Sequence, residues 1–303
     1  MNAIPGTQNT PRHLEQLAAQ RELYSEAKII QAVEMISALL PPLLLLFALL
    51  IGERLYVYAA LLGCILAVLD VALWSPLQKK KRQAAAIIQE LFDCEVFGMP
   101  WNSVEAGQRP TPELVAKYAE KYNKKVHKGS PIDKWYSPDI GALPLPLARV
   151  ACQRSNIVWD LELRRRYVFR IAFLLSFLTV GVVVLALVRG LTVEGFLLSI
   201  VLPLVPAYVV GLQQIFDQRE AMVRLDRLLD HATRLWDNAL EREVSEATLD
   251  QESRRLQDQI FSHRAQTPTI FDWIYKRLRG EQERLMYKGI EDLVEEARKR
   301  GRV

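Results

Sequence analysis

Four runs of apolar residues constrain the fold of this chain more than any other feature of its sequence. Met35–Gly52, Ile171–Val188 and Gly195–Phe216 contain no charged residue, and Leu55–Trp74 contains one, Asp70. An apolar helix of about 18 or more residues is long enough to cross a bilayer. The pattern therefore excludes a soluble two-domain protein and predicts four transmembrane helices, with most of the 303 residues in water.

The charges that flank these runs predict the orientation of the chain. The short links at 52–54 and 189–194 each carry one basic residue, whereas Lys79–Arg82 follow the second run and Arg164–Arg166 precede the third. Basic residues are retained on the cytoplasmic side of a membrane. We therefore expect two transmembrane hairpins, with both termini and the long middle segment in the cytosol.

This topology divides the chain into five segments. They are an N-terminal cytosolic helix (1–32), a first hairpin (33–76), a cytosolic helical domain (77–166), a second hairpin (167–212) and a C-terminal cytosolic helical region (213–303). Helical periodicity and helix-start signals recur outside the apolar runs, and the middle segment shows no alternation of strand type. The expected fold is an all-α membrane protein whose four transmembrane helices extend into cytosolic helices.

The middle segment is the most basic part of the chain. Residues 77–166 contain 16 Lys and Arg against 10 Asp and Glu, whereas residues 213–303 contain 17 against 18. Positive charge of this kind suits an anionic ligand or anionic lipid headgroups. It also follows from the retention of basic residues at membrane exits, so both interpretations stay open.

Familiar catalytic and metal-binding patterns are missing from the sequence. The four His residues are scattered, and the spacings of Cys64, Cys94 and Cys152 match no metal or redox motif. Gly190 and Gly195 have the spacing of a phosphate-binding loop, but Phe196 stands where that loop requires Lys. We expect no enzymatic activity, no cofactor and no metal site, and we expect most of the acidic residues outside the apolar runs to be solvated.

Polar and proline residues within the apolar runs suggest conduction and gating. Asp70 lies inside the second run and Glu34 at the edge of the first, so antiparallel helices would bring two acids to similar depth and favour cations. Alternatively, Asp70 snorkels toward the membrane surface or pairs with Lys79 or Arg82. Proline kinks a helix because it lacks an amide donor, so Pro41 and Pro42 are candidate gating residues.

Two spacings predict helix contacts. Ala59, Gly63 and Ala67 recur at every fourth residue, which lets another helix approach closely. Beyond the last run, a heptad seam over less than three repeats is formed by Met222, Leu225, Leu229, Ala232, Trp236 and Ala239. Each pattern fits packing within one chain or between the subunits of a homo-oligomer.

Four groups of motifs resemble the SMODS-associated four-transmembrane effector family of bacterial anti-phage defence. They are LAAQRELYSEAK at 17–28, LFDCEVFGMPWN at 91–102, WYSPD at 135–139 with CQRSN at 152–156, and LQDQIFSHR at 256–264 with IFDWIY at 270–275. They follow one another around the two predicted hairpins and extend over nearly the whole chain.

The resemblance implies a toxic effector in the bacterial inner membrane. In such systems a nucleotidyltransferase senses infection and makes a cyclic oligonucleotide. The effector binds this messenger, oligomerises or rearranges, and permeabilises the membrane, so that the infected cell stops growing or dies before phage matures. This role implies no contact with a DNA or RNA polymer.

A cyclic oligonucleotide requires cations for its phosphates and flat surfaces for its bases, which Arg and the aromatic residues provide. The candidates in the middle segment are Trp101, Trp135, Tyr136, Arg149 and Arg154. Each aromatic candidate can instead be a core anchor of a small helical domain. Trp159, beside the membrane-proximal basic cluster, is expected to anchor the membrane interface.

The alternative function is a non-conducting membrane scaffold that recruits a cytosolic partner through residues 213–303. A small transporter is a weaker possibility, because the apolar runs contain few polar groups.

Overall fold

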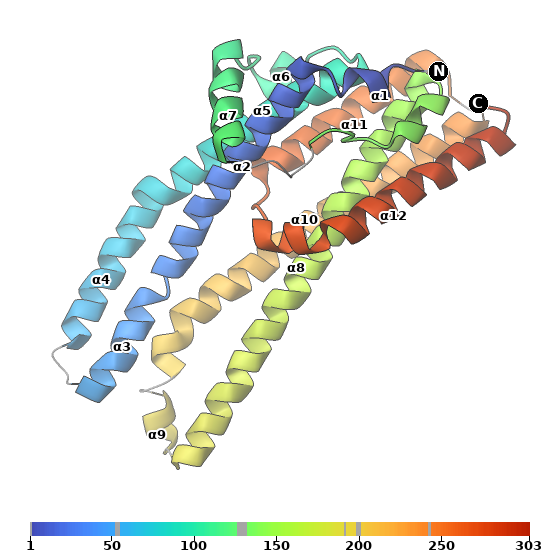
Figure 1. Cartoon of the computed structure of the whole chain (residues 1–303). Helices are drawn as coiled ribbons and strands as arrows, with labels where there is room; N and C mark the ends of the chain where they lie inside the picture. The colour runs from blue at the N-terminus through green and yellow to red at the C-terminus, as the bar shows by residue number, and fades with distance from the viewer. Residues whose placement is uncertain (1, 52–54, 126–131, 191, 198–200, 242–243) are drawn as a thin grey trace.

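The computed structural model describes residues 2–51, 55–125, 132–190, 192–197, 201–241 and 244–303. These residues form helices joined by short connections, and no strand occurs among them, which confirms the all-α class. Long helices run from one end of the molecule to the other, and two pairs of them diverge away from the remaining helices (Figure 1).

In the first pair, one member is a helix interrupted near its middle, and the other is a long helix that contains a π-helical turn. Its elements are α2 (Pro11–Ser37), α3 (Leu40–Ile51), α4 (Leu55–Leu69), the π-helical turn η1 (Asp70–Trp74) and α5 (Ser75–Phe97). Pro41 and Pro42 lie in the first turn of α3, where a missing amide donor costs little. The chain therefore ends one helix and begins another at Ala38–Leu39, rather than bending a continuous helix at the prolines.

The second pair contains the longest helix of the protein. Helix α8 (Leu145–Arg189) has 45 residues, which is about 68 Å at 1.5 Å per residue. It is followed by α9 (Val193–Phe196) and α10 (Leu202–Glu241), and α10 packs along α8. Phe173 and Phe177 of α8 are exposed, as expected of side chains that face lipid.

Three helical stretches are long and apolar enough to cross a membrane, namely Pro11–Leu44, Val57–Phe97 and Leu145–Val188. They agree with the first three predicted spans, and their length and composition are those of membrane-spanning helices. The fourth predicted span includes residues 198–200, which lie outside the described residues, so the arrangement of four spans in two hairpins stays a prediction.

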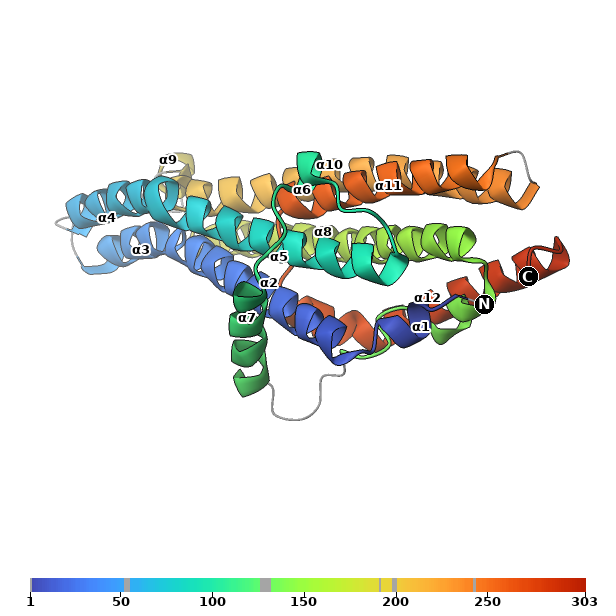
Figure 2. The same ribbon diagram turned by 90° about the horizontal axis from the view of Figure 1, so that it is seen from above.

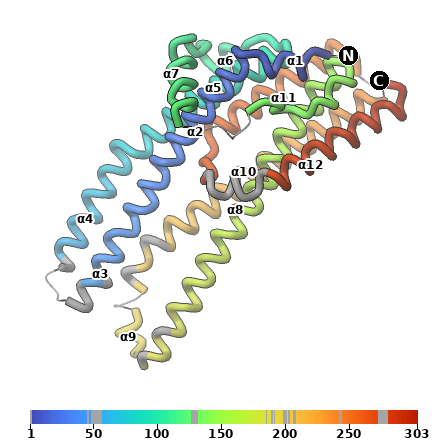
Figure 3. Tube along the Cα trace, in the orientation of Figure 1, coloured from blue at the N-terminus to red at the C-terminus, as the bar shows by residue number. Residues whose placement is uncertain are grey.

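Both chain termini lie at the end of the molecule away from the tips of α3, α4, α8 and α9 (Figure 3). The topology inferred from flanking charges requires the two termini to share a side, and this arrangement agrees with it. Assignment of that side to the cytosol stays a prediction.

The remaining elements form one helical layer outside the apolar stretches. They are α1 (Ile4–Thr7), α6 (Ser103–Ala106), α7 (Pro112–Lys125), the 3-10 turn η2 (Pro138–Ala142), α11 (Glu246–Gln266) and α12 (Asp272–Lys299). Seen from above, α8 runs between α10 and α11 on one side and α12 on the other (Figure 2). We refer to these elements, together with the parts of α2, α5, α8 and α10 that lie beyond the apolar runs, as the aqueous layer.

The aqueous layer has a core that draws on distant parts of the sequence. Its largest cluster of buried side chains includes Ile4 and Leu17, Phe92 and Phe97, Leu147, Trp236, Leu249 and Leu293. Leu225, Ala232, Trp236 and Ala239 of the heptad seam are all buried against helices of the same chain. The seam is therefore an intrachain contact. The boundaries of the five predicted segments stay a prediction.

Candidate ligand site

A cavity of about 250 Å³ lies within the aqueous layer. Its walls come from α2, α5, α8, α10, α11 and α12, together with residues 132–135 and the linker between α11 and α12. Four of these helices, α2, α5, α8 and α10, continue toward the apolar stretches. The cavity thus lies where the membrane helices meet the rest of the protein.

Five basic side chains line this cavity: Arg21, Lys28, Lys134, Arg164 and Arg264. Among the described residues, neither Arg21 nor Lys134 forms a salt bridge with a carboxylate. The Arg21 guanidinium lies 5.6 Å from the centre of the Trp135 ring and donates a long hydrogen bond of 3.4 Å to the Tyr122 hydroxyl. Both cations are therefore available to an anionic ligand.

The backbone around Lys134 is held in a fixed and uncommon conformation. Lys134 has a φ of 55°, which residues other than glycine adopt only when their surroundings impose it. Its amide donates to the Asn9 side-chain oxygen at 2.9 Å, and its carbonyl accepts from the Tyr287 hydroxyl at 3.4 Å. These contacts fix the segment that carries Lys134 and Trp135 at the cavity wall.

Four aromatic side chains share the cavity with these cations: Tyr24, Trp135, Trp159 and Tyr287. Trp135 is half-buried and meets the Phe92 ring edge to face at 6.4 Å, and Tyr24 donates to Gln89 at 3.2 Å. Arginine binds phosphate through a planar fork, and aromatic faces stack on nucleobases. The lining therefore has both chemical components that a nucleotide requires.

A smaller polar cluster lies in the same wall. His263 Nε2 contacts Asp160 at 2.9 Å, Arg164 donates to the same carboxylate at 3.1 Å, and the Thr267 hydroxyl lies 3.3 Å from His263 Nδ1. Burial lowers the pKa of His263 below its ordinary value of 6.5, the Asp160 carboxylate opposes this shift, and Arg164 adds to it. The imidazole is therefore neutral near pH 7.

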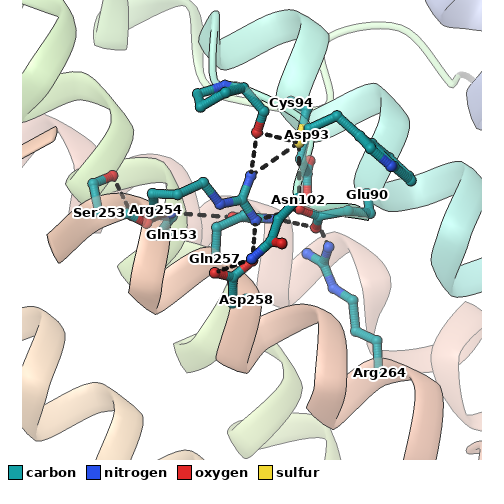
Figure 4. Close-up of polar contacts among 12 residues, drawn as sticks. Glu90, Asp93, Cys94, Asn102, Gln153, Ser253, Arg254, Gln257, Asp258 and Arg264 are labelled. Carbon is teal, nitrogen blue, oxygen red and sulfur yellow. Dashed lines mark hydrogen bonds and ion pairs between the residues drawn. The ribbon is translucent and has the colours of Figure 1, made fainter. Parts of the chain in front are cut away.

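Behind the cavity, two buried acids of α5 are bound by two arginines of α11 (Figure 4). Arg264 donates to Asp93 at 2.6 Å, and Arg254 donates to Glu90 at 2.6 Å and to Asp258 at 2.8 Å. Gln257 donates to both acids, at 2.8 Å to Glu90 and 3.1 Å to Asp93. Glu90 and Asp93 are exceptions to the expectation that acids outside the apolar runs are solvated, and they are buried because these partners replace water.

Of the five residues predicted to bind the ligand, Trp135 lines the cavity. Tyr136 is buried and donates its hydroxyl to Asp93 at 2.7 Å. Burial and the Asp93 charge raise the pKa of Tyr136 well above its ordinary value of 10, so it stays a hydrogen-bond donor. Its contacts are those of a core anchor.

The other three candidates lie outside the cavity lining. Trp101 donates to the Gly107 carbonyl at 2.8 Å, under the Arg109 guanidinium. Arg149 donates to the Phe97 and Gly98 carbonyls at 2.6 and 3.1 Å, where α5 ends, and Arg154 contacts Thr233 at 3.4 Å. Each of these side chains thus makes contacts within the aqueous layer, and their proposed role as ligand contacts has not been tested.

Sequence reasoning missed most of the cavity lining. Arg21, Tyr24 and Lys28 are spaced by three and four residues, so they share one face of α2. That spacing was the available signal, and the three residues fall within the motif at 17–28. His263 and Arg264 fall within the motif at 256–264. Trp159, which was expected to anchor the membrane interface, lines the cavity. Three of the four motif groups behind the resemblance thus contribute to the cavity lining, and the group at 91–102 does not.

The small-residue pattern of the second span is a contact within the chain. Ala59 is buried, and a Cβ atom added to Gly63 would lie 3.8 Å from Pro41 of α3, whereas Ala67 is exposed. The first two positions therefore bring α4 close to the start of α3. Any contact of Ala67 with another subunit stays a prediction.

The acid inside the second span opens the π-helical turn. This turn contacts α2, the helix that carries Glu34. Asp70 Oδ1 is shielded from solvent and has no hydrogen-bond partner among the described residues. No salt bridge joins Asp70 to Lys79 or Arg82, so the pairing that would have neutralised it is not seen in this part of the chain.

Comparison with known proteins gives one family and one relative. The family model described as "SMODS-associating 4TM effector domain" matches residues 2–293. A protein of Bacillus cereus (strain VD146), described as a probable CBASS effector molecule, is 23% identical over 278 residues, which cover 88% of this chain and 90% of the relative. No solved structure matches this chain.

Proposed function

Because this chain belongs to the SMODS-associating 4TM effector domain family, we propose that it is a membrane effector that a cyclic oligonucleotide switches on. The messenger, made by a partner nucleotidyltransferase, binds in the cavity of the aqueous layer. The membrane helices then rearrange within a homo-oligomer and permeabilise the inner membrane, which causes abortive infection. The protein acts by binding and not by catalysis.

The observation that carries this proposal is the chemistry and position of the cavity. Arg21 and Lys134, which form no salt bridge among the described residues, line it together with aromatic rings. Three of its wall helices, α2, α5 and α8, belong to stretches that are long and apolar enough to cross a membrane. A ligand can shift a conformational equilibrium only by its different affinity for the two states. A site built from the membrane helices themselves meets this requirement, because any movement of the helices changes the site.

The size of the cavity indicates in which direction the wall helices move when the ligand binds. Its volume of about 250 Å³ lies just below the range of about 300–1,000 Å³ typical of small-molecule sites. It fits one nucleotide unit better than a whole cyclic oligonucleotide. Binding of the whole ring therefore favours an arrangement in which the wall helices lie further apart. To move the protein from almost entirely closed to almost entirely open, the ligand must bind the open state more tightly by about 5.5 kcal/mol. Several sites of an oligomer can share this binding free energy.

The test is dye release from vesicles that contain the purified full-length protein. Cyclic di-AMP, 3′,3′-cyclic GMP–AMP and cyclic tri-AMP are added separately, with AMP as the linear control. We expect one cyclic compound to bind and to cause release, and AMP to cause none. Vesicles that stay sealed with every cyclic compound, although one of them binds, would contradict permeabilisation.

A matched pair of variants tests the site. Arg21 and Arg109 each cover a tryptophan ring, at 5.6 and 5.8 Å, but only Arg21 lines the cavity. A hydrogen bond to a charged group contributes about 1.5–3 kcal/mol, so Arg21→Gln should weaken binding about tenfold or more. Arg109→Gln should bind as the unchanged protein does. Equal affinities in the two variants would remove Arg21 from the site.

A further inference from the structure

The end of α11 and its connection to α12, residues 265–271, have an unusual set of hydrogen-bond partners. The Arg82 side chain of α5 donates to the Ala265 carbonyl at 3.0 Å, and Arg164 of α8 donates to the Pro268 carbonyl at 3.2 Å. The Thr269 hydroxyl donates to the side-chain oxygen of Gln31 in α2. Side chains of three helices that lead into the membrane therefore hold this segment.

The contact network extends to a fourth helix, α10, through Gln31 and Arg164. The amide of Gln31 donates to Gln214 of α10 at 3.5 Å, and Gln31 also accepts a hydrogen bond of 3.2 Å from Gln78 of α5. Arg164 donates to Gln218, also in α10. Gln31, Gln218 and Thr269 are buried, so water does not substitute for these bonds.

The same segment forms part of the cavity wall. Thr267, Pro268, Thr269 and Ile270 line the cavity, and Ile270 packs against Leu163 and Tyr167 of α8. Ala265 and Gln266 end α11, and Thr267 caps it through a backbone bond to the His263 carbonyl. The residues that follow, up to Phe271, lie between the two helices, so side chains of other elements contribute to their position. Any ligand that fills the cavity contacts this segment, and any displacement of the segment acts on α2, α5, α8 and α10.

We propose that residues 265–271 are the coupling element between the cavity and the membrane helices, and that Gln31 is the residue through which three of those helices respond together. This inference rests on the proposed function and specifies how its ligand acts. The hydrogen bonds to Gln31, Arg82 and Arg164 carry the coupling, because they join the segment to α2, α5 and α8.

Gln31 allows a test that leaves the ligand contacts intact, since it does not line the cavity. Gln31→Met keeps the length of the side chain and removes three hydrogen bonds. Gln20→Met is the matched control, because Gln20 is also buried in α2 but has no hydrogen-bond partner among the described residues. Both full-length variants are placed in vesicles, and binding and dye release are measured with the cyclic compound that the unchanged protein binds.

We expect Gln31→Met to bind that compound within about threefold of the unchanged protein and to release at least about tenfold less dye, since each hydrogen bond shifts an equilibrium by about two- to tenfold. Gln20→Met should bind and release normally. Arg82→Met, which removes a different bond to the segment, should repeat the Gln31→Met result.

The outcomes separate the two proposals. Binding with equal release in Gln31→Met and Gln20→Met would overturn the coupling role and leave the proposed function standing. Failure of the unchanged protein to bind any of the three cyclic compounds would contradict the proposed function, and the coupling role with it.

Discussion

His263 shows how single residues of the cavity respond to their surroundings. Its imidazole is buried, Asp160 and Thr267 occupy its two ring nitrogens, and Arg164 and Arg224 place positive charge nearby. A neutral ring that donates from Nε2 to Asp160 and accepts at Nδ1 from Thr267 satisfies all three groups. Protonation would leave the Thr267 hydroxyl without an acceptor and add a third cation to the cluster.

This arrangement predicts that acid destabilises the folded protein through His263. The pKa of His263 is lowered on folding, so between pH 6.5 and the folded pKa the unfolded chain binds more protons than the folded one. Stability contributed by the neutral ring is complete above about pH 6.5 and is lost as the pH falls through the folded pKa. His263→Gln should therefore lose less stability than the unchanged protein between about pH 7.5 and about pH 5, measured by thermal unfolding in detergent.

His231→Gln is the control for that measurement. His231 is half-exposed and lies 3.7 Å from Glu252, away from the cavity lining. A pH dependence of His231→Gln equal to that of His263→Gln would show that His263 does not carry the effect.

Residue types in the site were predictable, but their positions in the chain were not. The sequence predicts that arginine and tryptophan or tyrosine side chains bind the ligand, and the cavity contains all three types. The predicted ligand-binding residues all lie within residues 77–166, whereas Arg21 and Arg264 of the cavity lining lie outside that segment. A cavity between helices depends on tertiary packing, and a single sequence shows no direct signal for it.

The π-helical turn is the element of the second span with the clearest consequence. Pro76 has no amide to donate, and the carbonyl that a continuous α-helix would pair with it belongs to Ala72, inside the turn. The wider turn accommodates this missing bond. It also places the turn that begins with Asp70 beside α2, the helix that carries Glu34.

Asp70→Asn should change the ions that pass, not the response to ligand. A carboxylate with one oxygen shielded from solvent and without a hydrogen-bond partner among the described residues attracts cations if it lines the conducting path. We expect the ratio of potassium to chloride permeability in ligand-treated vesicles to fall toward one. Reversal potentials in a planar bilayer measure this ratio. Glu105→Gln, a change to an exposed acid of the aqueous layer, should leave it unaltered, and an unaltered ratio in Asp70→Asn would place Asp70 outside the path.

Helices were the most predictable elements of this fold. Charge-free apolar runs and helix-start signals at Thr10–Pro11 and Thr111–Pro112 agree with α2, α3, α7 and α8. The break at Ala38–Leu39 and the π-helical turn were not predicted. Both depend on how a helix with a proline satisfies its backbone beside a neighbouring helix, and the position of that neighbour is a tertiary fact.

At the scale of the whole molecule, the C-terminal helices are part of the core rather than an appended arm. Large apolar side chains of α11 and α12 are buried in the aqueous layer, namely Leu249, Leu256, Ile260, Phe261, Ile290, Leu293 and Val294. Trp236 of α10 is fully buried and donates to Glu296 of α12 at 3.0 Å. This arrangement bears on the alternative function, a scaffold that recruits its partner through residues 213–303.

The scaffold alternative expects a chain without α11 and α12 to keep an intact remainder and to lose only its partner. Burial of each such side chain contributes about 1.5–3 kcal/mol, so their loss removes on the order of 10–20 kcal/mol, which exceeds the typical stability of about 5–15 kcal/mol. We therefore expect deletion of residues 245–303 to make the aqueous layer sensitive to protease, as measured by limited proteolysis of membranes. The milder change Glu291→Lys with Glu295→Lys alters an exposed face of α12 and preserves the core. An effector that acts on the membrane itself keeps its ligand-dependent dye release in this double variant, whereas loss of phage protection with full release would favour the scaffold.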